Sequence, residues 1–193
     1  MGCGPYRLTG SRRGATSLAQ VCRKFFVAGL LTTVALTASL VSTHAQVHDW
    51  TGQTSSNWFV GGNWDATFPP RRTDDVSINT VTPNATVIGQ PGAVANTLDI
   101  GPNGTGMLTI QTGGTLVNEL ALIGNLPGGL GTVMVTGAGS SWTNVGTVVV
   151  GGQGTGTLTV QDGGTMRSAG GSVGLSAGST GTVTVTGDRK SVV

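Results

Sequence analysis

The sequence has little charge and few aromatic rings. Only 9% of its 193 residues are charged and 5% are aromatic. This charge is too low for a solvated disordered chain. After residue 45 the chain carries five basic and eight acidic residues, a net charge of −3. Clustered Lys and Arg are the basis of phosphate affinity, so we expect no nucleic-acid partner.

Cysteine and histidine are nearly absent. Both cysteines, Cys3 and Cys22, lie before Phe25. The rest of the chain therefore has no disulfide framework, thiolate nucleophile or zinc–thiolate site. The histidines are His44, which we expect to be removed with a leader, and His48, which we expect to lie in a frayed start. A Ser-His-Asp site needs a held imidazole, and neither residue supplies one.

The N-terminus has the parts of a secretory signal. Basic residues lie at Arg7, Arg12, Arg13, Arg23 and Lys24. Residues 25–42 carry no charge, and the small residues Thr43 and Ala45 then precede a cleavage point before Gln46. We therefore predict a signal peptide at residues 1–45. The alternative is an uncleaved membrane anchor, since an apolar-leaning run of this length can just span a bilayer.

Glycine is abundant, and it marks a repeat. Gly106, Gly131, Gly156 and Gly181 each open a segment such as GTLTV, and each of the three intervals between them is twenty-five positions. A second set of glycines (Gly101, Gly124, Gly151 and Gly174) precedes these by five or seven positions in alternation. The two loop lengths alternate, so the larger repeat consists of two units.

Each repeat unit has the alternation of a short strand. Leu108 and Ile110 flank Thr109, and Leu158 and Val160 flank Thr159 in the same way. One unit cannot bury its own apolar face, whereas equal spacing lets each unit stack on the last. The repeat therefore predicts an all-β fold, a β-solenoid of the right-handed parallel β-helix type, over residues 98–187. The alternative is an antiparallel sandwich with glycine-rich hairpins.

Residues 46–97 lack the repeat and contain Trp50, Trp58 and Trp64. We predict that this N-terminal segment caps the solenoid, because a terminal coil exposes an unpaired edge and an open core. The alternative is a carbohydrate-stacking platform, with Trp58 and Trp64 as glycan contacts. Trp142 follows a turn, and we expect it to pack on a loop.

Residues that could perform catalysis are scattered. Between positions 98 and 187 the charged residues are Asp99, Glu119, Asp162 and Arg167. Their offsets from the repeat glycines differ, so stacking does not align the acids, and carboxylate catalysis needs paired groups. Asp74-Asp75 lacks the ligand spacing of calcium loops and predicts a solvated turn. We therefore expect no enzyme, no catalytic residue, no cofactor and no metal.

The order of these motifs resembles the passenger region of bacterial autotransporter-type proteins. The motifs are W-x-G, S-x-x-W, N-W and D-D-V-x-I, then L-x-I-G, G-x-L-T-[IV]-Q-x-G-G-T and G-T-V-x-V-T-G-x-G-S-x-W, over residues 50–187. The resemblance implies a signal peptide read by secretion machinery and a β-helical passenger. It also implies a C-terminal outer-membrane barrel, which carries the passenger to the cell surface.

The end of the sequence departs from that resemblance. Residues 188–193 read DRKSVV where the repeat predicts a continuing neutral unit, and no barrel-like strands follow. We interpret residues 188–193 as a non-native or truncated end and the chain as a fragment. The expected function is an exported, non-enzymatic passenger, acting as stalk, adhesin or interaction scaffold toward an unknown surface glycan or protein. The alternative is a fragment of an exported carbohydrate-active or carbohydrate-binding β-helix protein.

Overall fold

The computed structural model describes residues 45–187. The predicted signal peptide, up to residue 44, and the predicted non-native end at 188–193 lie outside the described residues. The described part is all-β, with thirteen strands, one short 3-10 turn at Gly61–Asn63 and no α-helix. It therefore contains no helix long and apolar enough to cross a membrane.

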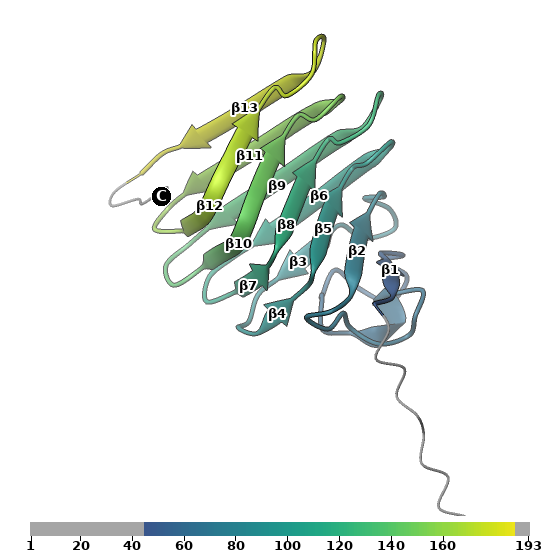
Figure 1. The fold of residues 1–193 in the computed structure, drawn as a ribbon. Helices are drawn as coiled ribbons and strands as arrows, with labels where there is room; N and C mark the ends of the chain where they lie inside the picture. Colours follow the sequence, from purple (N-terminus) through teal and green to yellow (C-terminus); the bar gives the residue numbers. More distant parts are fainter. Residues whose placement is uncertain (1–44, 188–193) are drawn as a thin grey trace, which may run out of the picture. The chain divides into compact units, whose positions relative to one another are not determined.

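The strands wind around three faces of a β-solenoid (Figure 1). Long strands β10 and β12 turn the corner between two faces, so each contributes a half to both. Face A consists of β1 (Val47–Asp49), β2 (Asp75–Ile78), β5 (Thr97–Ile100), β8 (Leu120–Ile123) and the second halves of β10 (Ser141–Val150) and β12 (Thr165–Val173). Face B consists of β3 (Thr86–Ile88), β6 (Thr105–Ile110), β9 (Leu130–Thr136), β11 (Thr155–Gln161) and β13 (Thr180–Val185). Face C consists of β4 (Ala93–Val94), β7 (Thr115–Asn118) and the first halves of β10 and β12.

Every pair of these strands is parallel, and each strand pairs with its equivalent one coil away. Leu108 pairs with Val133, Val133 with Leu158, and Leu158 with Val183. The predicted column of aliphatic residues is therefore confirmed, and with it the β-solenoid. The antiparallel sandwich is wrong for this chain, because its hairpins would pair neighbouring strands in opposite directions.

The alternating loop lengths appear as alternating registers. From β6 onward, paired residues on face B keep the twenty-five-position interval of the repeat, as in Thr105 and Leu130. On face A the partner of Leu98 is Ala121, twenty-three positions on, and the partner of Ala121 is Val148, twenty-seven positions on. The longer coil contains the loop in which seven positions separate Gly124 from Gly131. It also contains an irregularity in β10 between Asn144 and Thr147. Two successive coils therefore restore the larger repeat.

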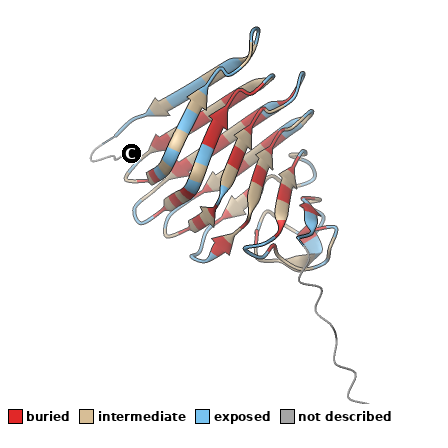
Figure 2. Ribbon diagram, in the orientation of Figure 1, coloured by how far each residue is buried: buried red, intermediate tan, exposed pale blue. Residues whose placement is uncertain are grey.

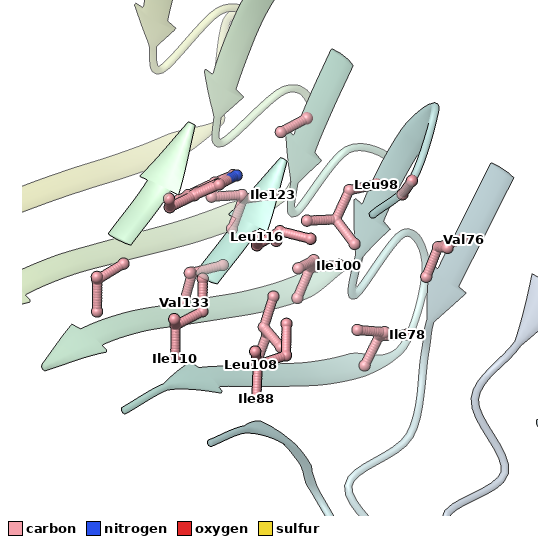
Figure 3. Close-up of a cluster of buried hydrophobic side chains, with 14 of the residues drawn as sticks. Val76, Ile78, Ile88, Leu98, Ile100, Leu108, Ile110, Leu116, Ile123 and Val133 are labelled. Atoms are coloured by element: carbon pink, nitrogen blue, oxygen red, sulfur yellow. The ribbon is translucent and has the colours of Figure 1, made fainter. Parts of the chain in front are cut away.

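The core is a stack of aliphatic side chains inside the three faces (Figure 3). Ile78, Leu98, Ile100, Leu108 and Ile123 are each fully buried. Figure 2 shows buried positions alternating with more exposed ones along the strands, as the period of two requires. Burying one such side chain contributes about 1.5–3 kcal/mol, so the stack is the main stabilising term.

Four of the repeat glycines are required by a close approach of successive coils. A Cβ atom on Gly106, Gly131, Gly156 or Gly181 would lie less than 3.0 Å from the carbonyl oxygen of an isoleucine or valine in the preceding coil. For Gly131 that oxygen belongs to Ile100, the last residue of β5. The constant spacing of these glycines is therefore a steric consequence of stacking.

The first coil of the solenoid lies within the segment that we predicted as the cap. Strands β2, β3 and β4 pair in parallel with β5, β6 and β7. Residues 46–97 therefore contain both this first coil and the residues that cover it, which include β1 and the three tryptophans.

Truncation of one core side chain tests this packing. We expect Leu108→Ala to lower the free energy of unfolding by about 2–5 kcal/mol, because it removes a fully buried side chain from the column. Thr109→Ala, one residue away and directed outward, is the matched control and should change it by less than about 0.5 kcal/mol. Urea unfolding followed by circular dichroism measures both. Equal effects of the two variants would contradict the assignment of the inner face.

Candidate functional site

The three tryptophans form one packed cluster at the start of the solenoid. Their rings meet edge to face, with centroids 4.9 Å apart for Trp50 and Trp64 and 4.8 Å for Trp58 and Trp64. The indole N–H of Trp50 donates to the carbonyl of Asn84 at 2.8 Å, and that of Trp64 donates to the carbonyl of Trp58 at 2.7 Å. Edge-to-face packing with satisfied N–H groups is the arrangement of a structural core.

The cluster offers no ring face to a ligand. Trp58 is 1% exposed and Trp64 is 2% exposed. A sugar ring stacks on an open aromatic face, and neither predicted glycan contact presents one. The geometry therefore favours the capping role of these residues.

His48 and Asp74 correct two expectations about this segment. His48 is fully buried in β1, where it pairs with Val76, so the prediction of a frayed start is wrong. Its Nε2 atom lies 3.2 Å from Oδ2 of Asp74. Asp74 is 3% exposed and also accepts the backbone N–H of Arg71 at 2.8 Å, so the prediction of a solvated turn is wrong for it. The cause is β1, which adds a strand to face A and carries His48 inward over the first coil.

The buried pair has no route to a substrate. The His48 ring lies edge-on to Phe68, with centroids 5.0 Å apart, and is enclosed on all sides. The neighbouring Asp75 accepts hydrogen bonds from the Asn96 side chain and the Thr97 backbone. In the part of the chain that the structure describes, no group of three or more His, Cys, Asp or Glu residues could hold a metal. The pair therefore belongs to the buried packing between β1 and the first coil.

Trp142 is placed differently from its prediction. It lies within β10 and is fully buried, so the expected loop position is wrong. Its indole N–H donates to Oδ1 of Asn118 at 2.8 Å, and the Asn118 amide donates to the carbonyl of Leu120. Asn118 stacks under Asn144, so two amides line the inside of the corner between faces C and A. Sequence alternation alone did not reveal them, because it assigns inward positions to aliphatic residues.

The four charged residues of the later coils do not converge. Asp99 points outward from face A, and Glu119 lies at the corner between faces C and A. Asp162 lies in the turn after β11 with a φ of 53°, and Arg167 is exposed on β12. The Asp162 carboxylate accepts a hydrogen bond from Thr136 at 3.1 Å, as suits a turn residue. These residues give no pair positioned across a common site.

Asp99 has a clearly altered acidity. Burial raises its pKa from 3.8 to about 6, and a hydrogen bond from Asn125 partly opposes that rise. Its Oδ1 atom is buried without a partner. Asp99 lies between Ser77 and Leu122 in adjacent strands, so its neighbours supply no second ionisable group. The group therefore costs stability when ionised, and the next carboxylate in its row, Asp49, lies two strands away beyond Ser77.

The described surface includes two hollows of note. One, of about 430 Å³, lies outside face B against the cap and is lined by Ser55, Ser56, Asn57, Val87, Gly89, Gln90 and Gln111. The other, of about 380 Å³, is the open inside of the last coil, where Val150, Leu158 and Val183 are among the lining residues. Neither hollow has a charged residue in its lining.

No protein-family model, curated protein or solved structure matches the chain.

The altered acidity of Asp99 predicts a pH-dependent stability. The folded chain holds the proton more tightly than the unfolded chain, so this group stabilises the fold below about pH 4, and the contribution is lost as the pH rises through about 6. Asp99→Asn should therefore raise the free energy of unfolding at pH 7.5 by about 1 kcal/mol, a figure reduced for solvent screening. The gain should vanish at pH 4.

Urea unfolding of both proteins between pH 4 and pH 8 measures this difference. Thr109→Ala, an outward substitution that removes no titratable group, is the control and should show no such pH-dependent gain. A gain for Asp99→Asn that is the same at pH 4 and pH 7.5 would contradict the role of burial.

Proposed function

We propose that the chain is the N-terminal part of an autotransporter-type passenger, exported through residues 1–45 and displayed as a non-enzymatic stalk or scaffold. The observation that carries this proposal is the contrast between the inside and outside of the coils. The inside is a continuous aliphatic column, and the outside rows hold mainly threonine and other uncharged residues. Such a body is rigid and extends by adding coils, and its long outer faces are available for adhesion.

The last described coil leaves part of its apolar inner side exposed. Val183 and Val185 are 38% and 41% exposed, whereas their partners Leu158 and Val160 in the coil before are 3% and 0% exposed. Figure 2 shows the same change, with the last strands mostly pale. A further coil of the same repeat would cover these side chains, and the stacking of a longer passenger would provide one.

The alternative, a fragment of an exported carbohydrate-active β-helix, requires ionisable groups that share one face. Glu119, Asp162 and Arg167 lie on other faces or corners than Asp99. Asp99 shares its outward row on face A with Asp49, but Ser77 lies between them, so the two carboxylates are about two strand spacings apart. This alternative would therefore draw further catalytic groups from coils beyond the described ones. The passenger role accounts for the described coils without that addition.

Export and display can be tested in a Gram-negative host. An epitope inserted at Gly178, in an open turn between β12 and β13, marks the chain without disturbing the core. With the downstream reading frame of the source DNA included, we expect an antibody to label intact cells. A matched version that lacks residues 2–45 should be labelled only after lysis.

Two results would contradict the proposal. If both versions are labelled only after lysis, the chain is not displayed at the cell surface. A stop codon directly after Val193 in the source DNA would remove the fragment interpretation, and residues 188–193 would then be native.

A further inference from the structure

We infer that the hollow between face B and the cap binds a neutral saccharide. The cap residues 55–58 run beside β3, with Asn57 bridged to Val87. The hollow lies outside this junction, between the cap and the ends of β3 and β6. Its volume of about 430 Å³ is within the range of small-molecule sites. The inference goes beyond the proposed function and does not depend on surface display.

The hollow exists because one side chain is missing from a row. Ile88 pairs with Ile110, and Ile110 with Val135, so Gly89, Gln111 and Thr136 follow each other in one outward row. Gln161 continues this row beside Thr136. The first coil alone has glycine there. Its lack of a side chain leaves a space that the later coils fill.

Conformation does not demand glycine at this position. A Cβ atom on Gly89 would meet only the side chain of Gln111, at the ordinary contact distance of 3.6 Å, and its φ does not lie in the left-handed region. The repeat glycines differ, because a Cβ there would collide with backbone. Gly89 is therefore a glycine whose evident structural effect is to leave the hollow open.

The walls supply hydrogen-bonding groups in pairs of donor and acceptor. Among residues 45–187 no hydrogen bond engages the side-chain amides of Gln90 and Gln111, and both residues are exposed. The Asn57 Oδ1 atom accepts the Phe59 backbone N–H at 3.0 Å, which fixes the side chain and leaves its amide N–H groups free. An amide donates and accepts at once, and so does each hydroxyl group of a sugar. The half-buried Val87 side chain gives an apolar floor for the C–H face of a sugar ring.

The same observations disfavour other classes of ligand. No charged residue lines the hollow, so it has nothing to pair with a phosphate, a carboxylate or a cation. An extended peptide would need free main-chain groups, but Val87 already donates to Ser56 at 2.7 Å and accepts from Trp58 at 3.0 Å. The free groups belong to side chains, and they match an uncharged polyhydroxyl ligand.

Saturation-transfer NMR on the purified full chain tests the inference. The probes are glucose, galactose, mannose and N-acetylglucosamine, each as the monosaccharide and as a short oligosaccharide, with inorganic phosphate and a neutral hexapeptide for comparison. We expect at least one saccharide to bind. Gly89→Gln should abolish the signal by filling the space, and Gln111→Ala should weaken binding about tenfold by removing paired hydrogen bonds.

The matched control is Gln161→Ala, which removes the same side chain from the same row two coils away. It should leave the affinity within about twofold of the unmodified protein. Circular dichroism spectra and melting temperatures show whether each variant is folded. We expect Gly89→Gln to fold, because the surroundings of Gly89 are open. The inference is overturned if no saccharide binds, if only the peptide or phosphate binds, or if a folded Gly89→Gln variant still binds.

Discussion

The structure depends on the close stacking of one coil on the next. At the start of each face B strand from β6 onward, the backbone passes so near the preceding coil that only glycine fits. A side chain at Gly131 would meet the carbonyl of Ile100, and one at Gly156 would meet that of Ile123. The same approach brings Leu108, Val133 and Leu158 into one buried column. The repeat glycines let the coils approach closely, and this close approach buries the aliphatic column. The two features therefore depend on each other.

This constraint leaves the outside of the solenoid free to vary. Inward positions must be aliphatic, whereas outward positions change from coil to coil without cost to the core. One such change, glycine in place of a longer polar residue at position 89, produces the hollow beside the cap. At the first coil the core is covered differently, since no earlier coil lies among residues 45–187. Trp50, Trp58 and Trp64 cover it there, together with His48 beside Asp74.

The repeat was predictable because its cause is local and periodic. Fixed glycine spacing and period-two alternation reported the column and the two loop lengths directly. The positions that sequence reasoning missed are those where a partner distant in sequence decides the environment. His48 is buried because β1 pairs with β2, and Trp142 is buried because Asn118, in the coil before, accepts its N–H. The hollow was missed for the same reason, since Gly89 matters only beside Gln111 and the cap.

A pair of engineered cysteines would test the register of the coils most directly, in a chain whose Cys3 and Cys22 have been replaced by serine. Met134 and Thr159 are paired and point outward, and adjacent strands lie about 4.8 Å apart, within the span of a disulfide. Met134→Cys with Thr159→Cys should therefore form a disulfide on mild oxidation. Met134→Cys with Thr157→Cys, offset by two positions and about 8 Å apart, should not. Ready oxidation of the offset pair, or failure of the paired one, would contradict the stacking on which the account depends.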